Sequence, residues 1–120
     1  TVNQIAENFV EYAEKIKWWC EHLGFEVPSV LLVAPPNVNE AQSRKAFGET
    51  FVGSQIKSTQ FPEEYKIVAN KLNWHFFDSA TVVHPSDIDG VHLDAENNKQ
   101  LGNALARVII EIFSTQNSEA

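Results

Sequence analysis

The 120-residue sequence contains a single cysteine, Cys20, and this scarcity excludes several classes of protein. No internal disulfide can form, and no zinc site can be built on cysteines. Cys20 falls in an apolar helical segment, without the helix N-terminus or neighbouring cation that would activate it as a nucleophile. We therefore expect a buried structural thiol.

Basic residues are also scarce, with nine Lys and Arg against sixteen Asp and Glu, for a net charge of −7. No basic patch stands out, which argues against nucleic acid as a partner. No apolar run in these residues is long enough to cross a bilayer, and none has the pattern of a signal peptide. The hydrophobic content of 43% and charged content of 21% are typical of a globular protein with a small core.

The first third of the chain predicts a helix and then a strand. Apolar residues recur at three- and four-residue steps over 3–23, and Gly24 is a suitable C-cap. The apolar stripe includes Trp19, which we expect in the core. The continuous apolar run 29–34 predicts a strand covered on both faces, as in a parallel sheet, and Pro35 with Pro36 ends it.

The remaining segments continue this alternation. The polar stretch 37–60 predicts a long loop with a short helix near Asn39 to Phe47. The elements expected after it are a helix over 62–73 with Pro62 in its first turn, a strand over 74–78, a loop over 79–93, and a helix from the cap Asp94 to about Phe113.

This order predicts an α/β fold with parallel strands, but two strands do not make a stable sheet of this kind. We therefore expect residues 1–113 to be the second half of a larger α/β domain. Residues 114–120 are small and polar, and we expect a flexible tail.

The segment Asp89-Gly90-Val91-His92 carries the strongest chemical signal. Glycine permits a tight turn that can bring the acid and the imidazole together. A carboxylate bonded to one ring nitrogen orients the imidazole, and the other nitrogen can then accept a proton from a serine. These residues supply two members of a hydrolytic triad, and no obvious nucleophilic serine accompanies them.

A metal site is the competing interpretation of this region, because five potential ligands fall within eleven residues: His84, Asp87, Asp89, His92 and Asp94. Their spacing matches no common metal cage, and Asp94 already has a role as a helix cap. We expect no metal here. His84 is expected near the mouth of the site, His75 to be packed or exposed on a strand, and His22 close to the C-terminal end of the first helix.

The run Ile88-Asp89-Gly90-Val91-His92-Leu93, with Asp94-Ala95-Glu96-Asn97-Asn98 after it, resembles the last conserved block of the SGNH (GDSL) hydrolases. The run 30–36 is similar to the family's fourth strand, and 76–80 to its fifth. Within the family, the arylesterase and acyltransferase branch is the most similar. The resemblance implies a three-layer, flavodoxin-like fold, with this chain as its C-terminal part.

The resemblance also implies roles for single residues. Asp89 and His92 would be the acid and base of the triad, and no other residue is carried over from the family. From their position on either side of the acid, and not from the resemblance, we expect Ile88 and Val91 to line the acyl side of a small ester substrate. The family's Gly-Asp-Ser and Gly-x-Asn-Asp blocks are absent, and Gly53-Ser54 is no substitute. The nucleophile is therefore expected on a missing N-terminal half of the same domain. No cofactor is implied.

Two questions stay open at this point. The aromatic residues Phe47 and Phe51 fit either a wall for an acyl or aryl group or a contact in a homo-oligomer. The chain as a whole fits either part of an esterase or a non-enzymatic α/β module that binds a partner, with the Asp/His pair idle.

Overall fold

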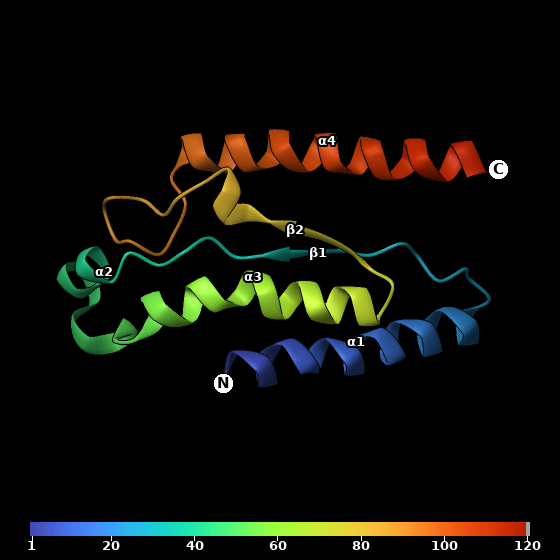
Figure 1. The fold of residues 1–120 in the computed structure, drawn as a ribbon, viewed down its shortest axis with the longest axis horizontal. Helices are drawn as coiled ribbons and strands as arrows, with labels where there is room; N and C mark the ends of the chain where they lie inside the picture. The colour runs from blue at the N-terminus through green and yellow to red at the C-terminus, as the bar shows by residue number, and fades with distance from the viewer. Residues whose placement is uncertain (120) are drawn as a thin grey trace. The chain divides into compact units, whose positions relative to one another are not determined.

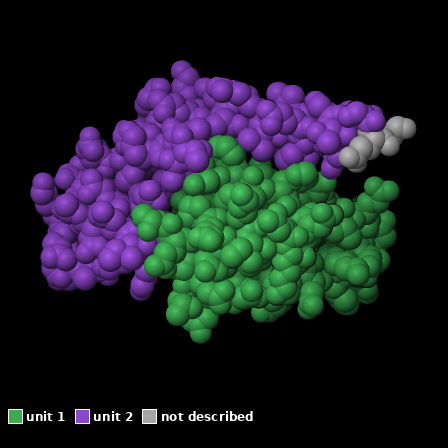
Figure 2. Space-filling model, viewed as in Figure 1, with its two compact units in different colours: residues 1–35, 59–78 green, residues 36–58, 79–120 purple. Residues whose placement is uncertain are grey.

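The computed structural model describes residues 1–119, which form two compact units (Figure 2). The first unit contains residues 1–35 and 59–78. The second contains residues 36–58 and the chain from residue 79 onward. In the described residues, no helix is long and apolar enough to span a membrane.

The first unit begins with helix α1, Val2–Leu23. Thr1 and Gln4 form a capping box, in which the Thr1 hydroxyl accepts the Gln4 N–H at 3.2 Å. Gly24 ends the helix in the left-handed conformation at φ 76°, as the sequence predicts. The local sequence therefore determines both ends of α1.

The sheet of the first unit has two parallel strands, β1 (Leu31–Ala34) and β2 (His75–Asp78). The predicted parallel pairing is confirmed, and Leu31 lies opposite His75. Alternate residues of β1 are buried, and they join residues of α1 and α3 in one apolar core. In the ribbon, the two strands run alongside α3 (Figure 1). The buried members of this core are Ala6, Leu32, Ala34, Tyr65, Val68 and Ala69. The other two residues of β1 are only half-buried, so the strand is not fully covered on both faces.

Helix α3 spans Ser54–Lys71, so the predicted start at Pro62 is wrong. Pro62 lies inside the helix and has no N–H to donate to the carbonyl of Ser58. The helix accommodates this loss because its later turns pack in the core through Tyr65, Val68 and Ala69, as the periodicity predicts.

The second half of α1 also departs from expectation. Trp19, predicted to be in the core, is 55% exposed, and Trp18 stacks on His22 with ring centroids 4.8 Å apart. A helix of 22 residues is roughly 33 Å long, whereas a four-residue strand spans roughly 13 Å. The helix is longer than the sheet, so its last turns do not pack against the apolar core. Cys20 is accordingly half-buried rather than buried.

The second unit contains α2 (Glu40–Phe47), the 3₁₀ turns η1 (Gly48–Phe51) and η2 (Ser79–Thr81), the first turn of α3, and α4 (Ala95–Glu119). The stretch 37–60, predicted to be mainly loop, is therefore mainly helical. Helix α4 also continues past the predicted end at Phe113. The hydroxyls of Ser114, Thr115 and Ser118 donate to carbonyls one turn back, so these polar residues are compatible with a helix.

Candidate active site

The centre of the candidate site is a direct contact between Asp89 and His92. Asp89 Oδ2 lies 2.7 Å from His92 Nδ1, and both residues belong to the loop between η2 and α4. The other carboxylate oxygen, Oδ1, accepts the backbone N–H groups of Val91 and His92, each at 2.9 Å. One carboxylate thus fixes both the turn and the imidazole ring.

These bonds determine the protonation pattern of the pair. The backbone N–H of Val91, the His92 ring and the His92 N–H together lower the pKa of Asp89 to about 2. An ionised carboxylate can only accept hydrogen bonds, so Nδ1 of His92 must be the donor. In the neutral ring, Nε2 then carries the lone pair. The ring is exposed, so this nitrogen is accessible as a base.

Gly90 allows this turn to form and to pack closely. Its φ is +70°, in the left-handed region that glycine tolerates. A Cβ at this position would lie 2.3 Å from the carbonyl oxygen of Asn39, and the Asn39 N–H donates to Gly90 O at 2.9 Å. Glycine is therefore required both by the backbone angle and by the approach of the α2 N-terminus.

Further hydrogen bonds close the loop around the pair. The Ser86 N–H donates to His92 O at 2.7 Å, and the Gly90 N–H donates to Ser86 O at 2.8 Å. The buried Ser86 hydroxyl accepts the Ile88 N–H at 2.9 Å. From α2, the Gln42 side-chain amide donates to the carbonyl of Asp87. The loop is thus held by its own backbone and by α2.

The first turn of α4 holds the other end of the loop. Asp94 Oδ1 accepts the Asn97 backbone N–H at 2.7 Å, which confirms Asp94 as the predicted cap and lowers its pKa. Buried Asn97 accepts the His84 N–H at 3.2 Å. The loop is therefore bonded to the helix at both of its ends.

Of the other residues singled out in the sequence, two flank Asp89 and two lie in the first unit. Ile88 is 83% exposed and Val91 is half-buried on either side of Asp89. His75 is exposed on β2 in the first unit, and His22 lies in the last turn of α1 as expected. Across residues 1–119, no three His, Cys, Asp or Glu side chains form a group able to hold a metal ion.

Sequence reasoning missed the residues that position the loop, namely Asn39, Gln42, Ser86 and Asn97. Two of them carry a weak local signal. Asn39 is a preferred N-cap residue at the start of a helix, and Ser86 is a preferred turn residue before an acid. Gln42 and Asn97 act through contacts 45 and 13 residues away in sequence, which no local pattern encodes.

The described residues lack one part of a triad. In this part of the chain, the only hydrogen-bond partner of the His92 ring is Asp89. An exposed imidazole oriented by a carboxylate, on an α/β fold with parallel strands, is the arrangement of acid and base in one class of hydrolases.

Comparison with solved structures identifies the type of hydrolase fold. A carbohydrate acetylesterase from Sinorhizobium meliloti matches 93% of this chain at 29% identity, with a TM-score of 0.83. An aryl esterase from M. smegmatis matches 92% at 27% identity and a TM-score of 0.81. A carbohydrate acetylesterase family member from Sinorhizobium meliloti matches 70% at 38% identity and 0.65. No family model and no curated protein matches the sequence.

These matches confirm the resemblance to SGNH-type esterases, and the chain has the fold of part of such an enzyme. The chain spans 53%, 52% and 39% of the three solved chains, in the order given. Its structural relatives are therefore esterases, and it corresponds to about half of the first two.

Proposed function

We propose that this chain supplies the acid and the base of a carboxylic ester hydrolase. The observation that carries the proposal is the 2.7 Å contact between Asp89 Oδ2 and His92 Nδ1, with Nε2 of an exposed ring left accessible. The esterase neighbours support the same reaction class.

In this reaction, His92 Nε2 accepts the proton of a serine hydroxyl as the serine oxygen attacks the ester carbonyl. The imidazolium that forms is stabilised by Asp89. When the bond between the acyl carbon and the alcohol oxygen breaks, His92 returns the proton to that oxygen. Water then attacks the acyl carbon on the serine, and His92 accepts the proton of this water and returns it to the serine oxygen as the acid is released. When an alcohol attacks in place of water, the product is a new ester.

We further propose that the serine and the oxyanion donors come from the other half of the esterase domain, which precedes residues 1–113 in sequence. Two observations support this division. The chain spans only about half of the esterase structures, and β1 pairs with β2 alone among the described residues. A two-stranded sheet has little stability by itself, so further strands beside this pair would complete it. Ile88 and Val91 are assigned to the acyl side of the completed pocket.

The test is hydrolysis of p-nitrophenyl acetate by the full-length protein and by its His92→Ala variant. We expect the variant to lose at least a thousandfold in kcat, because no other group takes the serine proton. His75→Ala is the matched control, since it removes an exposed histidine from the first unit, and it should retain full activity. Residual activity of His92→Ala near the wild-type value would refute the assignment.

The 120-residue chain provides a second measurement. Without a serine at His92 Nε2, it should release no burst of p-nitrophenol. A stoichiometric burst from this chain would contradict the proposed division of the triad. Turnover in neither the chain nor the full-length protein would favour a non-enzymatic binding module instead.

A further inference from the structure

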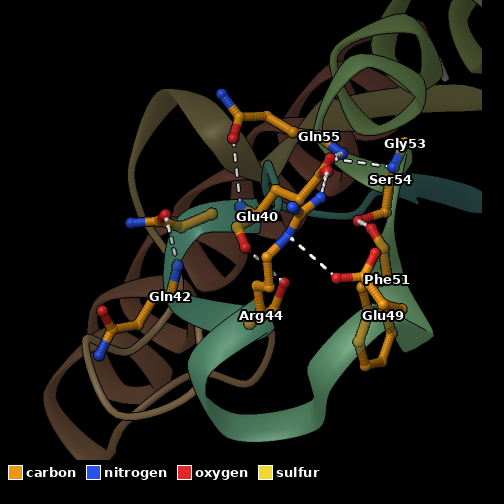
Figure 3. A network of polar contacts seen from close by, with 10 residues as sticks. Glu40, Gln42, Arg44, Glu49, Phe51, Gly53, Ser54 and Gln55 are labelled. Atoms are coloured by element: carbon orange, nitrogen blue, oxygen red, sulfur yellow. Dashed lines mark hydrogen bonds and ion pairs between the residues drawn. The ribbon is translucent and has the colours of Figure 1, made fainter.

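The starts of helices α2 and α3 are joined by a reciprocal pair of side-chain caps (Figure 3). Glu40 Oε2 accepts the N–H of Gly53, directly before α3, at 3.0 Å, and that of Gln55, in its first turn, at 3.4 Å. In return, the Glu40 N–H at the first position of α2 donates to Gln55 Oε1 at 3.1 Å. The first N–H groups of a helix have no acceptor within that helix. Each helix start therefore receives an acceptor from the other helix.

The Glu40 carboxylate acts mainly through these backbone N–H groups and not through its ion pair. Its other oxygen, Oε1, lies 3.4 Å from Arg44 Nη2, and the Arg44 side chain is 51% exposed. An exposed ion pair contributes little to stability, whereas a hydrogen bond from a backbone N–H to an ionised carboxylate is one of the stronger kinds. The Glu40 side chain is only 22% exposed, so its bonds to α3 are partly shielded from water. The link between the two helices therefore depends on the carboxylate oxygen that faces α3.

Helix α2 needs such links to keep its position. It has eight residues and is roughly 12 Å long, and a helix of this length is not stable alone. Among the described residues of α2, Ser43 alone is buried, so apolar burial does not anchor the helix. Directly before α2, the Val38 N–H donates to the buried Ser58 hydroxyl of α3 at 2.9 Å. The start of α2 is therefore held on α3 by polar bonds.

The same start of α2 contacts the turn that carries the acid and the base. The Asn39 N–H donates to Gly90 O at 2.9 Å. Gly90 lies between Asp89 and His92 in the sequence, so a shift of this contact moves the backbone that joins the pair. The contact between Asp89 Oδ2 and His92 Nδ1 is 2.7 Å long, and a misplacement of about 1 Å can cost a reaction about a hundredfold in rate.

We propose that Glu40 is a positioning residue for the acid–base pair. Its carboxylate holds the start of α2 on α3, and the start of α2 holds the backbone at Gly90, so that Asp89 keeps His92 oriented. This inference rests on the proposed esterase function and extends it to a residue that takes no part in proton transfer. Loss of the carboxylate should therefore slow the reaction without weakening the binding of the ester.

The kinetic test is hydrolysis of p-nitrophenyl acetate by Glu40→Ala in the full-length protein, well below the melting temperature and per folded molecule. We expect kcat to fall about tenfold because the base is misplaced, and KM to change less than about twofold. Glu40→Gln keeps a carbonyl oxygen that can accept the same N–H groups, so its kcat should lie within about threefold of the wild type. Glu49, the other acidic neighbour of Arg44, is 75% exposed. Glu49→Gln removes the same charge and should keep the wild-type kcat.

Amide hydrogen exchange separates a local effect from a general loss of stability. The Asn39 N–H reports the contact between α2 and the turn. The His75 N–H, which donates to Val30 O at 2.9 Å, reports the first unit. Glu40→Ala should accelerate exchange at Asn39 about tenfold and leave exchange at His75 unchanged. The control Glu49→Gln should change neither.

Gln55→Ala carries the test if Glu40→Ala does not fold. Gln55 is exposed, and alanine is the best helix former, so this variant should fold. It removes the acceptor of the Glu40 N–H, and it should lower kcat about threefold and accelerate exchange at Asn39.

A wild-type kcat per folded molecule in Glu40→Ala would overturn this inference, and so would a change confined to KM. Equal losses of kcat in Glu40→Ala and Glu40→Gln, or equal acceleration of exchange at Asn39 and His75, would also overturn it. Each of these results would leave the esterase assignment intact, because His92→Ala tests that assignment separately. Wild-type activity of His92→Ala would overturn both.

Discussion

Each of the two units is stabilised internally by a different kind of interaction. Among the described residues, eight hydrophobic residues are buried, and seven of them lie in the first unit: Val2, Ala6, Leu32, Ala34, Tyr65, Val68 and Ala69. The five buried polar residues in the described part of the chain lie in the second unit: Ser43, Ser58, Ser79, Ser86 and Asn97. The first unit therefore depends on removal of apolar surface from water, and the second on hydrogen bonds between defined atoms.

This difference explains why the candidate site belongs to the second unit. Apolar burial is not directional, and a core tolerates small shifts of its side chains. Hydrogen bonds require defined distances and angles, so they fix the positions of the groups that they join. Asp89 and His92 must hold a 2.7 Å contact, and the network of Ser86, Asn39 and Asn97 around them supplies the necessary restraint.

The largest effect is expected from Gly90→Ala in the second unit. The new Cβ would lie 2.3 Å from Asn39 O, in a backbone conformation that alanine disfavours. We expect a loss of about 3 kcal/mol in the free energy of unfolding. Because the turn carries both Asp89 and His92, we expect kcat/KM of the full-length protein to fall at least a hundredfold. Chemical denaturation and ester hydrolysis measure the two losses.

Gly102→Ala is the matched control for this substitution. Gly102 lies within α4, and a Cβ there would have no heavy atom of another segment within 4 Å. Alanine should stabilise the helix by about 0.5–1 kcal/mol and leave activity unchanged. Equal effects at the two glycines would show that the loop is not specifically fitted to Gly90.

A smaller effect, of a different kind, is expected from Val68→Ala in the first unit. Val68 is 1% exposed in the apolar core, and the loss of two methyl groups should cost about 2 kcal/mol of unfolding free energy. Its neighbour Ile67 is 53% exposed, and Ile67→Ala should cost less than about 0.5 kcal/mol.

The conclusion that the first unit does not set the geometry of the site fails if Val68→Ala lowers the activity of the folded protein. Esterase activity should be assayed well below the melting temperature and expressed per folded molecule. We expect both variants to retain wild-type kcat, because neither residue belongs to the unit that carries Asp89 and His92. A tenfold loss of kcat in Val68→Ala would show that core packing also sets the geometry of the site.

The sequence predicts the parts of this structure that local rules control. Short patterns predict the C-cap of α1, the N-cap of α4, the parallel strands and a close approach of Asp89 to His92. The structure confirms the caps and the strands and shows the contact between Asp89 and His92, whose catalytic role stays a proposal. Exposure of Trp19 could not be predicted, because periodicity identifies an apolar face without saying what covers it. The start of α3 was missed because Pro62 is normally a first-turn residue.

The smallest effect expected concerns the pH dependence of Asp89. Its pKa of about 2 lies below the ordinary 3.8 because the folded loop bonds its ionised form. The carboxylate therefore stabilises the folded state fully above pH 3.8, and this contribution disappears as the pH falls through about 2. Urea unfolding of the wild type and of Asp89→Asn is compared from pH 5 downward, below the range in which imidazoles ordinarily titrate, and the difference in unfolding free energy should be constant down to about pH 4.5. The difference should shrink progressively below pH 3.8. A difference that persists undiminished at pH 2 would mean that hydrogen bonds to ionised Asp89 do not hold the loop.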